Sequence, residues 1–401
     1  MNRVKKFVKF VRTHWPLELS VSLFLAVSLL LLFVQLRTLV GGYSQEERLV
    51  EVATNSFPNL LDNILYWPYY LLVYALRFVV TDGILAARII SASLAFLATF
   101  NILLIINRWF STELAIVGAT VFVSCSWLLQ IGRVGTPQIM GIAVLLSIFT
   151  GMLWLIYRPK KILPSIFTGV ALVFGMFVPF IPLLILAGLL LAVFKERNLL
   201  KVVPIWLWAL IGIGIISIIL LYVFGGLKNY GQTSKILGIP DDLPNLHTLL
   251  VNLRSSLAAI FWYAPANPAQ WVGNLPLLDI FGVVMVTLGV YHHERTSSDR
   301  RSLILFGSTL IILLMTALSG GINSPGFSLL LPLVALFIIS GLYEFLNLWR
   351  KVFPVNPIAK ILSVMVVAIL VSVSSYYQLS RYFIAWSNSP QTRDIYSVNI
   401  K

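Results

Sequence analysis

Long apolar runs set the strongest limit on the fold of this chain. Runs of roughly 17 to 23 residues recur from one end to the other, which is about the length that an α-helix needs to cross a bilayer. The chain is 59% hydrophobic and only 11% charged, whereas soluble proteins are about a quarter charged. The sequence therefore predicts an all-α polytopic membrane protein.

The apolar runs predict about eleven transmembrane helices. These cover residues 17–37, 84–106, 113–130, 138–157, 163–178, 181–195, 202–224, 276–292, 302–319, 327–347 and 359–379. The prolines at 179 and 182 are expected to split one apolar stretch into two short helices, because proline cannot continue a helix.

The stretch 64–80 is apolar as well, but a span there would move the later basic loops to the outer side. It also carries Tyr and Trp rings that suit the headgroup region. We therefore predict an interfacial or re-entrant helix at 64–80, and a second interfacial helix at 246–263.

The net charge of +14 reflects basic residues gathered in short loops between apolar runs. This is the positive-inside pattern, so no nucleic-acid partner is expected. The pattern predicts a multi-pass membrane protein with the N-terminus cytoplasmic and the C-terminus outside. We expect its membrane to be a bacterial plasma membrane. Residues 1–160 are expected to form an N-terminal module with an outer loop at 38–83, and residues 161–401 the remaining helices with an outer loop at 225–275.

Two of the 15 acidic residues, Glu46 and Glu47, are adjacent in the first outer loop. A carboxylate in a partly desolvated cleft can accept a proton from an attacking hydroxyl, which makes either residue a candidate general base. The alternative is a solvated loop in which Arg48 is a local partner.

Arg88 and Arg133 fall on the same outer face. Arginine binds phosphate through a planar fork of donors, so these two residues are candidates for holding the phosphate of a lipid donor, with Arg48 as a further cationic candidate. The alternative for each is a headgroup contact or a helix anchor.

The sequence gives little indication of a metal site or of a transporter. The run His292-His293-Glu294 would point its histidines apart on a helix, so we predict no metal site there, and use of a divalent cation is left open. The interiors of the predicted spans carry no ionisable residue, which disfavours a transporter.

The order of features in the first 160 residues resembles the GT-C superfamily. A first span, an outer loop with an acidic pair, the aromatic-proline run 66–70 and a span that opens with Arg88 follow one another as they do there. These polytopic glycosyltransferases use polyprenyl-phosphate-linked sugars. The nearest branch contains the protein mannosyltransferases and the lipid A aminoarabinose transferase.

The resemblance implies a general base at Glu46 or Glu47 and donor-phosphate binding by Arg88, Arg133 and Arg48. It also implies a substrate cleft near Tyr43, Trp67, Tyr69 and Tyr70. Two features depart from the family pattern: a lysine expected beside the aromatic-proline run is missing, and Gln138 stands where an aspartate is common.

The function implied is transfer of a sugar from a polyprenyl-phosphate donor to an outer-face lipid, glycan or protein. Because of these departures we keep a second hypothesis, that the chain is a non-catalytic relative that binds lipid phosphate or acts as a scaffold. A transporter or flippase is the third.

Overall fold

The computed structural model describes residues 2–158, 161–194, parts of 204–216 and 234–240, and then 243–264, 274–296 and 299–396. Within these ranges every regular element is a helix, which confirms the all-α prediction. The predicted span at 202–224 lies mostly outside the described residues.

The described residues up to 194 form η1 and ten α-helices. They are α1 (Asn2–Phe33), η1 (Leu39–Gly41), α2 (Gln45–Ala53), α3 (Phe57–Leu61), α4 (Trp67–Leu76), α5 (Gly83–Trp109), α6 (Thr112–Ser124), α7 (Ser126–Arg133), α8 (Gln138–Tyr157), α9 (Ile162–Gly175) and α10 (Ile181–Phe194).

The described elements of the second half begin with α14. They are α14 (Leu246–Phe261), α15 (Ile280–Arg295), α16 (Arg300–Leu318), η2 (Gly321–Asn323), η3 (Phe327–Leu329), α17 (Leu330–Val352), α18 (Pro357–Ser380), the π-helix η4 (Arg381–Trp386) and α19 (Pro390–Tyr396).

Five helices in the described part of the chain are long and apolar enough to cross a membrane, and α6 with α7 makes a sixth if that bent pair is one span. The pair bends by 64° at Cys125, so the region predicted as a single span at 113–130 is not straight. The predicted break near 179 is present, because α9 ends at Gly175 and α10 begins at Ile181.

Helix α4 has ten residues, which at about 1.5 Å per residue is too short to cross a bilayer. This agrees with the prediction that 64–80 is not a span. Its location at the membrane interface stays a prediction, as does that of α14.

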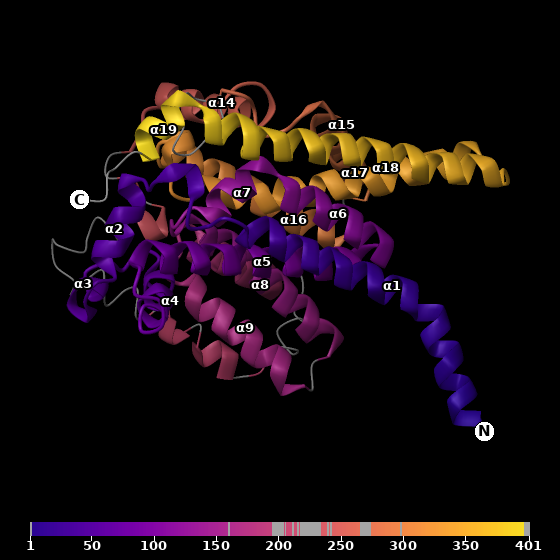
Figure 1. The fold of residues 1–401 in the computed structure, drawn as a ribbon, viewed down its shortest axis with the longest axis horizontal. Coiled ribbons are helices and arrows are strands. Elements are labelled where there is room, and N and C mark those ends of the chain that lie inside the picture. The colour runs from indigo at the N-terminus through magenta and orange to yellow at the C-terminus, as the bar shows by residue number, and fades with distance from the viewer. Residues whose placement is uncertain are drawn as a thin grey trace.

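The short helices that form the candidate site lie together at one end of the molecule. In Figure 1, α1 starts at one end of the molecule, while α2, α3, α4 and α19 gather at the opposite end. Helix α19 packs against η1, and α2 packs against α5. We call this end of the molecule the α2 end.

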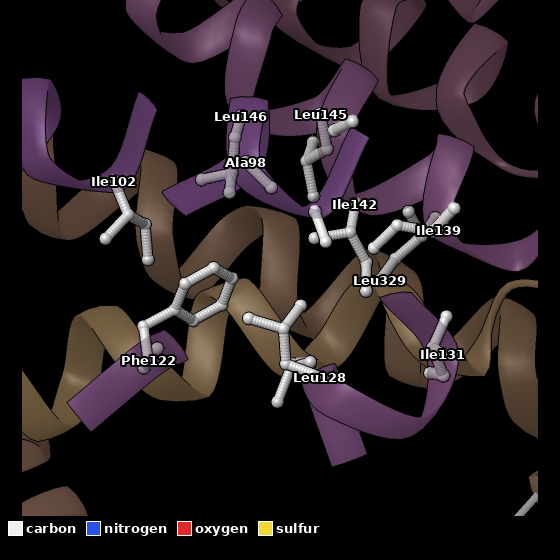
Figure 2. Packing of buried hydrophobic residues seen from close by; sticks show 14 of the residues in the cluster. Ala98, Ile102, Phe122, Leu128, Ile131, Ile139, Ile142, Leu145, Leu146 and Leu329 are labelled. Carbon is white, nitrogen blue, oxygen red and sulfur yellow. The ribbon is translucent and has the colours of Figure 1, made fainter. Parts of the chain in front are cut away.

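The core lies where α5 meets α6, α7 and α8 (Figure 2). Ala98 and Ile102 of α5 face Phe122 and Leu128 across this interface, and all four are buried. Small residues on α5 let its neighbours approach closely. The core therefore holds α7, and the chain that follows it, directly against α5.

Helices α15 and α17 cross in backbone contact. A Cβ atom added at Gly289 would lie 2.0 Å from the Phe337 carbonyl oxygen, and one added at Gly341 would lie 1.9 Å from the Met285 carbonyl oxygen. Glycine is therefore required at both positions for this close crossing.

We expect Gly289→Ala to lower the unfolding free energy by about 1–3 kcal/mol, because the backbones must separate. Gly307→Ala on α16 is the matched control, since nothing lies within 4 Å of a Cβ added there. Thermal unfolding of both variants in detergent checks this. Equal melting temperatures would show that the α15–α17 crossing tolerates a side chain.

Candidate functional site

A capping box orients the acidic pair. Helix α2 begins after Ser44, whose hydroxyl accepts a hydrogen bond from the Glu47 N–H at 3.3 Å, while the Ser44 N–H donates to Glu47 Oε2 at 3.0 Å. The two residues thus satisfy each other's backbone donors at the helix start. This turns the Glu47 side chain inward and leaves Glu46 exposed on the first turn.

Glu47 forms a buried ion pair with Arg88. Arg88 Nε donates to Glu47 Oε1 at 2.7 Å, and Arg88 Nη2 donates to Oε2 at 2.9 Å. The backbone N–H of Gly135 donates to Oε1 at 2.9 Å. With Ser44, four N–H groups therefore bind this carboxylate, which about fills its acceptor sites. Glu47 has little capacity left to accept a proton from a substrate.

Arg88 is committed to holding the chain together. Its Nη1 donates to the Leu36 carbonyl oxygen at 2.8 Å, and its Nη2 donates to the Gly42 carbonyl oxygen at 2.7 Å. The side chain is buried. One guanidinium thus ties the end of α1, the turn after η1 and the start of α2 to α5, so it does not face a ligand in this arrangement.

The link between α7 and α8 joins the same network through Gly135. A Cβ atom at this position would lie 2.9 Å from the Ala87 side chain and 3.3 Å from the Arg88 backbone nitrogen. The absence of a side chain lets the Gly135 N–H reach Glu47. This explains the run from Arg133 to Pro137, which brings α7 and α8 to the ion pair.

Glu46 differs from its neighbour in its electrostatic setting. Its side chain is exposed at the surface, but surrounding protein removes part of its hydration, and this desolvation together with the charge of Glu47 raises the pKa of Glu46 above 4.5. Tyr70 lies within its electrostatic reach, and burial together with the Glu46 charge raises the pKa of Tyr70 to about 12. Glu46 is therefore a candidate proton acceptor, with its carboxylate exposed and its pKa raised.

A cavity of about 380 Å³ lies at the α2 end, with Arg133 in its wall. Arg133 Nη2 donates to the Val34 carbonyl oxygen. Its guanidinium carbon lies 5.3 Å from the centre of the Tyr382 ring and 4.8 Å from that of Phe383. The cavity is lined by Gln35, Thr38, Leu39, Val40, Gly41, Arg133, Tyr382, Phe383, Trp386, Ser387, Asn388 and Arg393.

Arg133 differs from Arg88 in how it is satisfied. Arg133 is 2% exposed, and its Nε has no hydrogen-bond partner among the described residues. The buried Tyr382 hydroxyl beside it is likewise unpaired within the described part of the chain. A buried donor without a partner costs about 1–3 kcal/mol, and an arginine with a spare donor in a cavity wall is suited to binding an acceptor such as phosphate.

The four aromatic residues expected to form a substrate cleft have different surroundings. The buried Tyr69 hydroxyl donates to the Ala87 carbonyl oxygen at 3.2 Å and interacts with Ser91 Oγ at 2.9 Å, so Tyr69 fastens α4 to α5. Tyr70 meets Tyr69 edge to face, with ring centres 5.9 Å apart.

Trp67 packs on Phe177, with ring centres 5.7 Å apart, and Tyr43 is half-buried before α2. None of the four lines the 380 Å³ cavity. Arg48 is exposed. The roles given to these five residues stay predictions.

Two signals in the sequence were missed. The spacing Ser44-x-x-Glu47 is a capping-box signature, and it would have separated Glu47 from Glu46. The run Arg381-Tyr382-Phe383 just beyond the last apolar stretch supplies two residues of the cavity wall, although it was not predicted as part of the site.

No group of three or more His, Cys, Asp and Glu side chains that could hold a metal ion occurs among the described residues. His292 Nδ1 interacts with Glu344 Oε2 at 2.7 Å, while His293 lies between Ser302 Oγ and Ser340 Oγ at 2.8 and 2.9 Å. The two histidines therefore join α15 to α16 and α17.

Neither a protein-family model nor a curated protein sequence matches the chain. Among solved structures, ArnT from Cupriavidus metallidurans bound to undecaprenyl phosphate is similar over 94% of this chain and 76% of that chain, with 14% identity and a TM-score of 0.53. The apo state of the same protein gives 13% identity and a TM-score of 0.52, over 96% of this chain and 78% of that chain. The chain thus shares its fold with ArnT over most of its length.

We expect Glu47→Gln to lower the unfolding free energy by about 3–5 kcal/mol, because it leaves the Arg88 charge buried without its counter-ion. Glu46→Gln makes the same chemical change one residue away and is expected to leave stability unchanged or slightly raised, since a raised pKa means that the folded state disfavours the ionised form. Thermal unfolding in detergent at pH 7 compares the two. A melting temperature for Glu47→Gln that matches Glu46→Gln would refute the structural role of the ion pair.

Proposed function

We propose that this chain, which has the GT-C fold, is a membrane glycosyltransferase that moves a sugar from a polyprenyl-phosphate donor to an acceptor at the α2 end. One observation carries the proposal: Arg133, whose buried Nε has no hydrogen-bond partner among the described residues, lines a cavity at this end of the molecule. That ArnT binds undecaprenyl phosphate on the same fold supports a donor of this class.

The cavity suits the phosphate of a lipid donor. Its lining includes Arg133 and Arg393 and no acidic residue, so its charge favours an anion. Its volume of about 380 Å³ lies in the range of small-molecule sites. Arg133 would donate from Nε to a phosphate oxygen, and the rings of Tyr382 and Phe383 would keep the guanidinium in place.

Glu46 would act as the general base. Its carboxylate would take the proton from an acceptor hydroxyl while that oxygen bonds to the anomeric carbon of the donor sugar. The bond from this carbon to the phosphate oxygen would break, and its electron pair would leave with polyprenyl phosphate. Arg133 would stabilise the phosphate charge that develops. Glu47 and Arg88 would hold Glu46 and Arg133 at the same end of the molecule.

The orientation proposed from the charge pattern places the α2 end on the outer side. In this orientation the start of α1 and α19 lie on opposite sides of the membrane, in keeping with their places at opposite ends of the molecule (Figure 1). The acceptor would then be a lipid, glycan or protein in the outer leaflet or beyond it.

A non-catalytic lipid-phosphate-binding protein is the second candidate. It is favoured by the position of Glu46 outside the lining of the cavity and by the missing lysine beside the aromatic-proline run. A protein of this kind would bind undecaprenyl phosphate through Arg133 and transfer no sugar. Arg133 is needed for both functions, while Glu46 is needed only for transfer.

We expect Glu46→Gln to lower kcat by about 100-fold or more, the usual contribution of a general base, and to leave donor binding unchanged. The measurement is sugar transfer by purified protein from a polyprenyl-phosphate donor to lipid, glycan or protein acceptors of the outer face. Thr54→Ser, at the C-terminal end of α2, is the control. Transfer by Glu46→Gln at the wild-type rate would remove Glu46 from the mechanism, and absence of transfer by wild type with donor bound would favour the second candidate.

The pH dependence of transfer gives an independent check. A base must be deprotonated to act, so kcat/KM is expected to rise with pH through the pKa of Glu46, at a pH above 4.5 because desolvation and Glu47 raise that pKa. The rise should vanish in the residual activity of Glu46→Gln. An unchanged acidic limb in that variant would assign the titration to another group.

A further inference from the structure

An unbroken series of aromatic contacts runs from the C-terminal helix to Arg133. Tyr396 meets Trp386 edge to face, with ring centres 5.5 Å apart at 82°. Trp386 stacks on Tyr382, with ring centres 5.1 Å apart at 15°, and Tyr382 carries the Arg133 guanidinium at 5.3 Å. The three rings are 1–2% exposed, so each is held from several sides.

The π-helix η4 makes this series possible. A π-turn is wider than an α-turn and often marks a functional site. Here it places Tyr382, Phe383 and Trp386 together in the cavity wall. Two consecutive residues therefore offer their rings to Arg133, at 5.3 and 4.8 Å.

Helix α19 is docked rather than loosely attached. Thr392 and Tyr396 are buried, while Gln391, Arg393 and Asp394 are exposed. The helix packs against η1, whose residues line the other side of the cavity. The C-terminal segment thus forms part of the enclosure around Arg133.

The Arg133 guanidinium is held mainly by aromatic rings, whereas the Arg88 guanidinium is held by hydrogen bonds. Arg88 is fixed by four hydrogen bonds to Glu47, Leu36 and Gly42. Among the described residues, the Arg133 guanidinium has one hydrogen bond, to Val34, and lies against two aromatic faces, with the Tyr382 hydroxyl close to it. The orientation of the Arg133 guanidinium therefore depends on the position of the Tyr382 ring, and that ring is held by Trp386.

We propose that Tyr396 is a positioning residue for the donor phosphate, which acts through Trp386 and Tyr382 to orient the guanidinium of Arg133. This inference rests on the proposed function, since it assumes that Arg133 binds the phosphate. The ring of Tyr396, rather than its hydroxyl, makes the contact with Trp386. The C-terminal helix is therefore part of the donor site although Tyr396 does not line the cavity.

Binding of undecaprenyl phosphate and of undecaprenol to the full-length protein in detergent tests the inference. Their affinity ratio reports the phosphate contact alone, because the two lipids share the polyprenyl chain. The variants are Tyr396→Leu, which fills the buried space without a ring, Tyr396→Phe, which keeps the ring, and Arg133→Gln. Tyr376→Leu is the matched control, since Tyr376 is 73% exposed on α18.

We expect Tyr396→Leu to weaken undecaprenyl phosphate binding by about five- to tenfold, in keeping with the strength of aromatic contacts, and to leave undecaprenol binding unchanged. Tyr396→Phe and Tyr376→Leu should bind as wild type does, and Arg133→Gln should lose the preference for the phosphate. If Tyr396→Leu does not fold, Trp386→Phe weakens the same contact and the same result is expected.

Two outcomes would overturn the inference, and they are distinguishable. In the first, Tyr396→Leu (or Trp386→Phe, if it replaces that variant) binds undecaprenyl phosphate with wild-type affinity, while Arg133→Gln loses the preference for the phosphate. This result would remove Tyr396 from the donor site and leave the proposed function intact. Equal binding of both lipids by the wild-type protein would refute the proposed function, and this inference with it.

Discussion

The buried pair of Glu47 and Arg88 is the interaction on which the α2 end depends. Burying two charges has a large desolvation cost unless the charges pair with each other and make additional hydrogen bonds. Here the carboxylate is bound by four N–H groups, and the guanidinium also binds two backbone carbonyl oxygens. The pair thereby joins α1, α2, α5 and the link between α7 and α8 at one point.

Within this network, residues of the same type have different roles. Glu47 is saturated by donors, whereas Glu46 is exposed and more basic than an ordinary carboxylate. Arg88 is saturated by acceptors, whereas Arg133 presents a buried Nε without a partner in the described structure. The residues that stabilise the site and those suited to chemistry are therefore adjacent in sequence or in space.

Much of the fold follows from hydropathy. The helix predicted at 138–157 coincides with α8, and the one predicted at 359–379 falls within α18, because each is a long apolar run with polar residues at both ends. The bend at Cys125 was not predicted. No proline or glycine stands there. Ser124 and Ser126 on either side of the bend bond to Ser375 and Gln378 of α18, and periodicity does not reveal contacts between segments so far apart.

The site was predictable in position but not in detail. The charge pattern brought Glu46, Glu47, Arg88 and Arg133 to one end, and the structure places them there. The contacts that separate their roles involve Gly135 and the carbonyl oxygens of Leu36 and Gly42. Backbone groups carry no sequence signal of their own, so these contacts follow only from the fold. The C-terminal aromatic series was missed for a related reason, since it lies more than 240 residues from Arg133 in the sequence.

The most direct test of this account is an experimental structure of the protein with undecaprenyl phosphate. The account predicts phosphate density in the cavity, within hydrogen-bonding distance of Arg133 Nε, with the ion pair of Glu47 and Arg88 intact. Phosphate bound to Arg88 with Glu47 displaced, or phosphate bound away from Arg133, would contradict it.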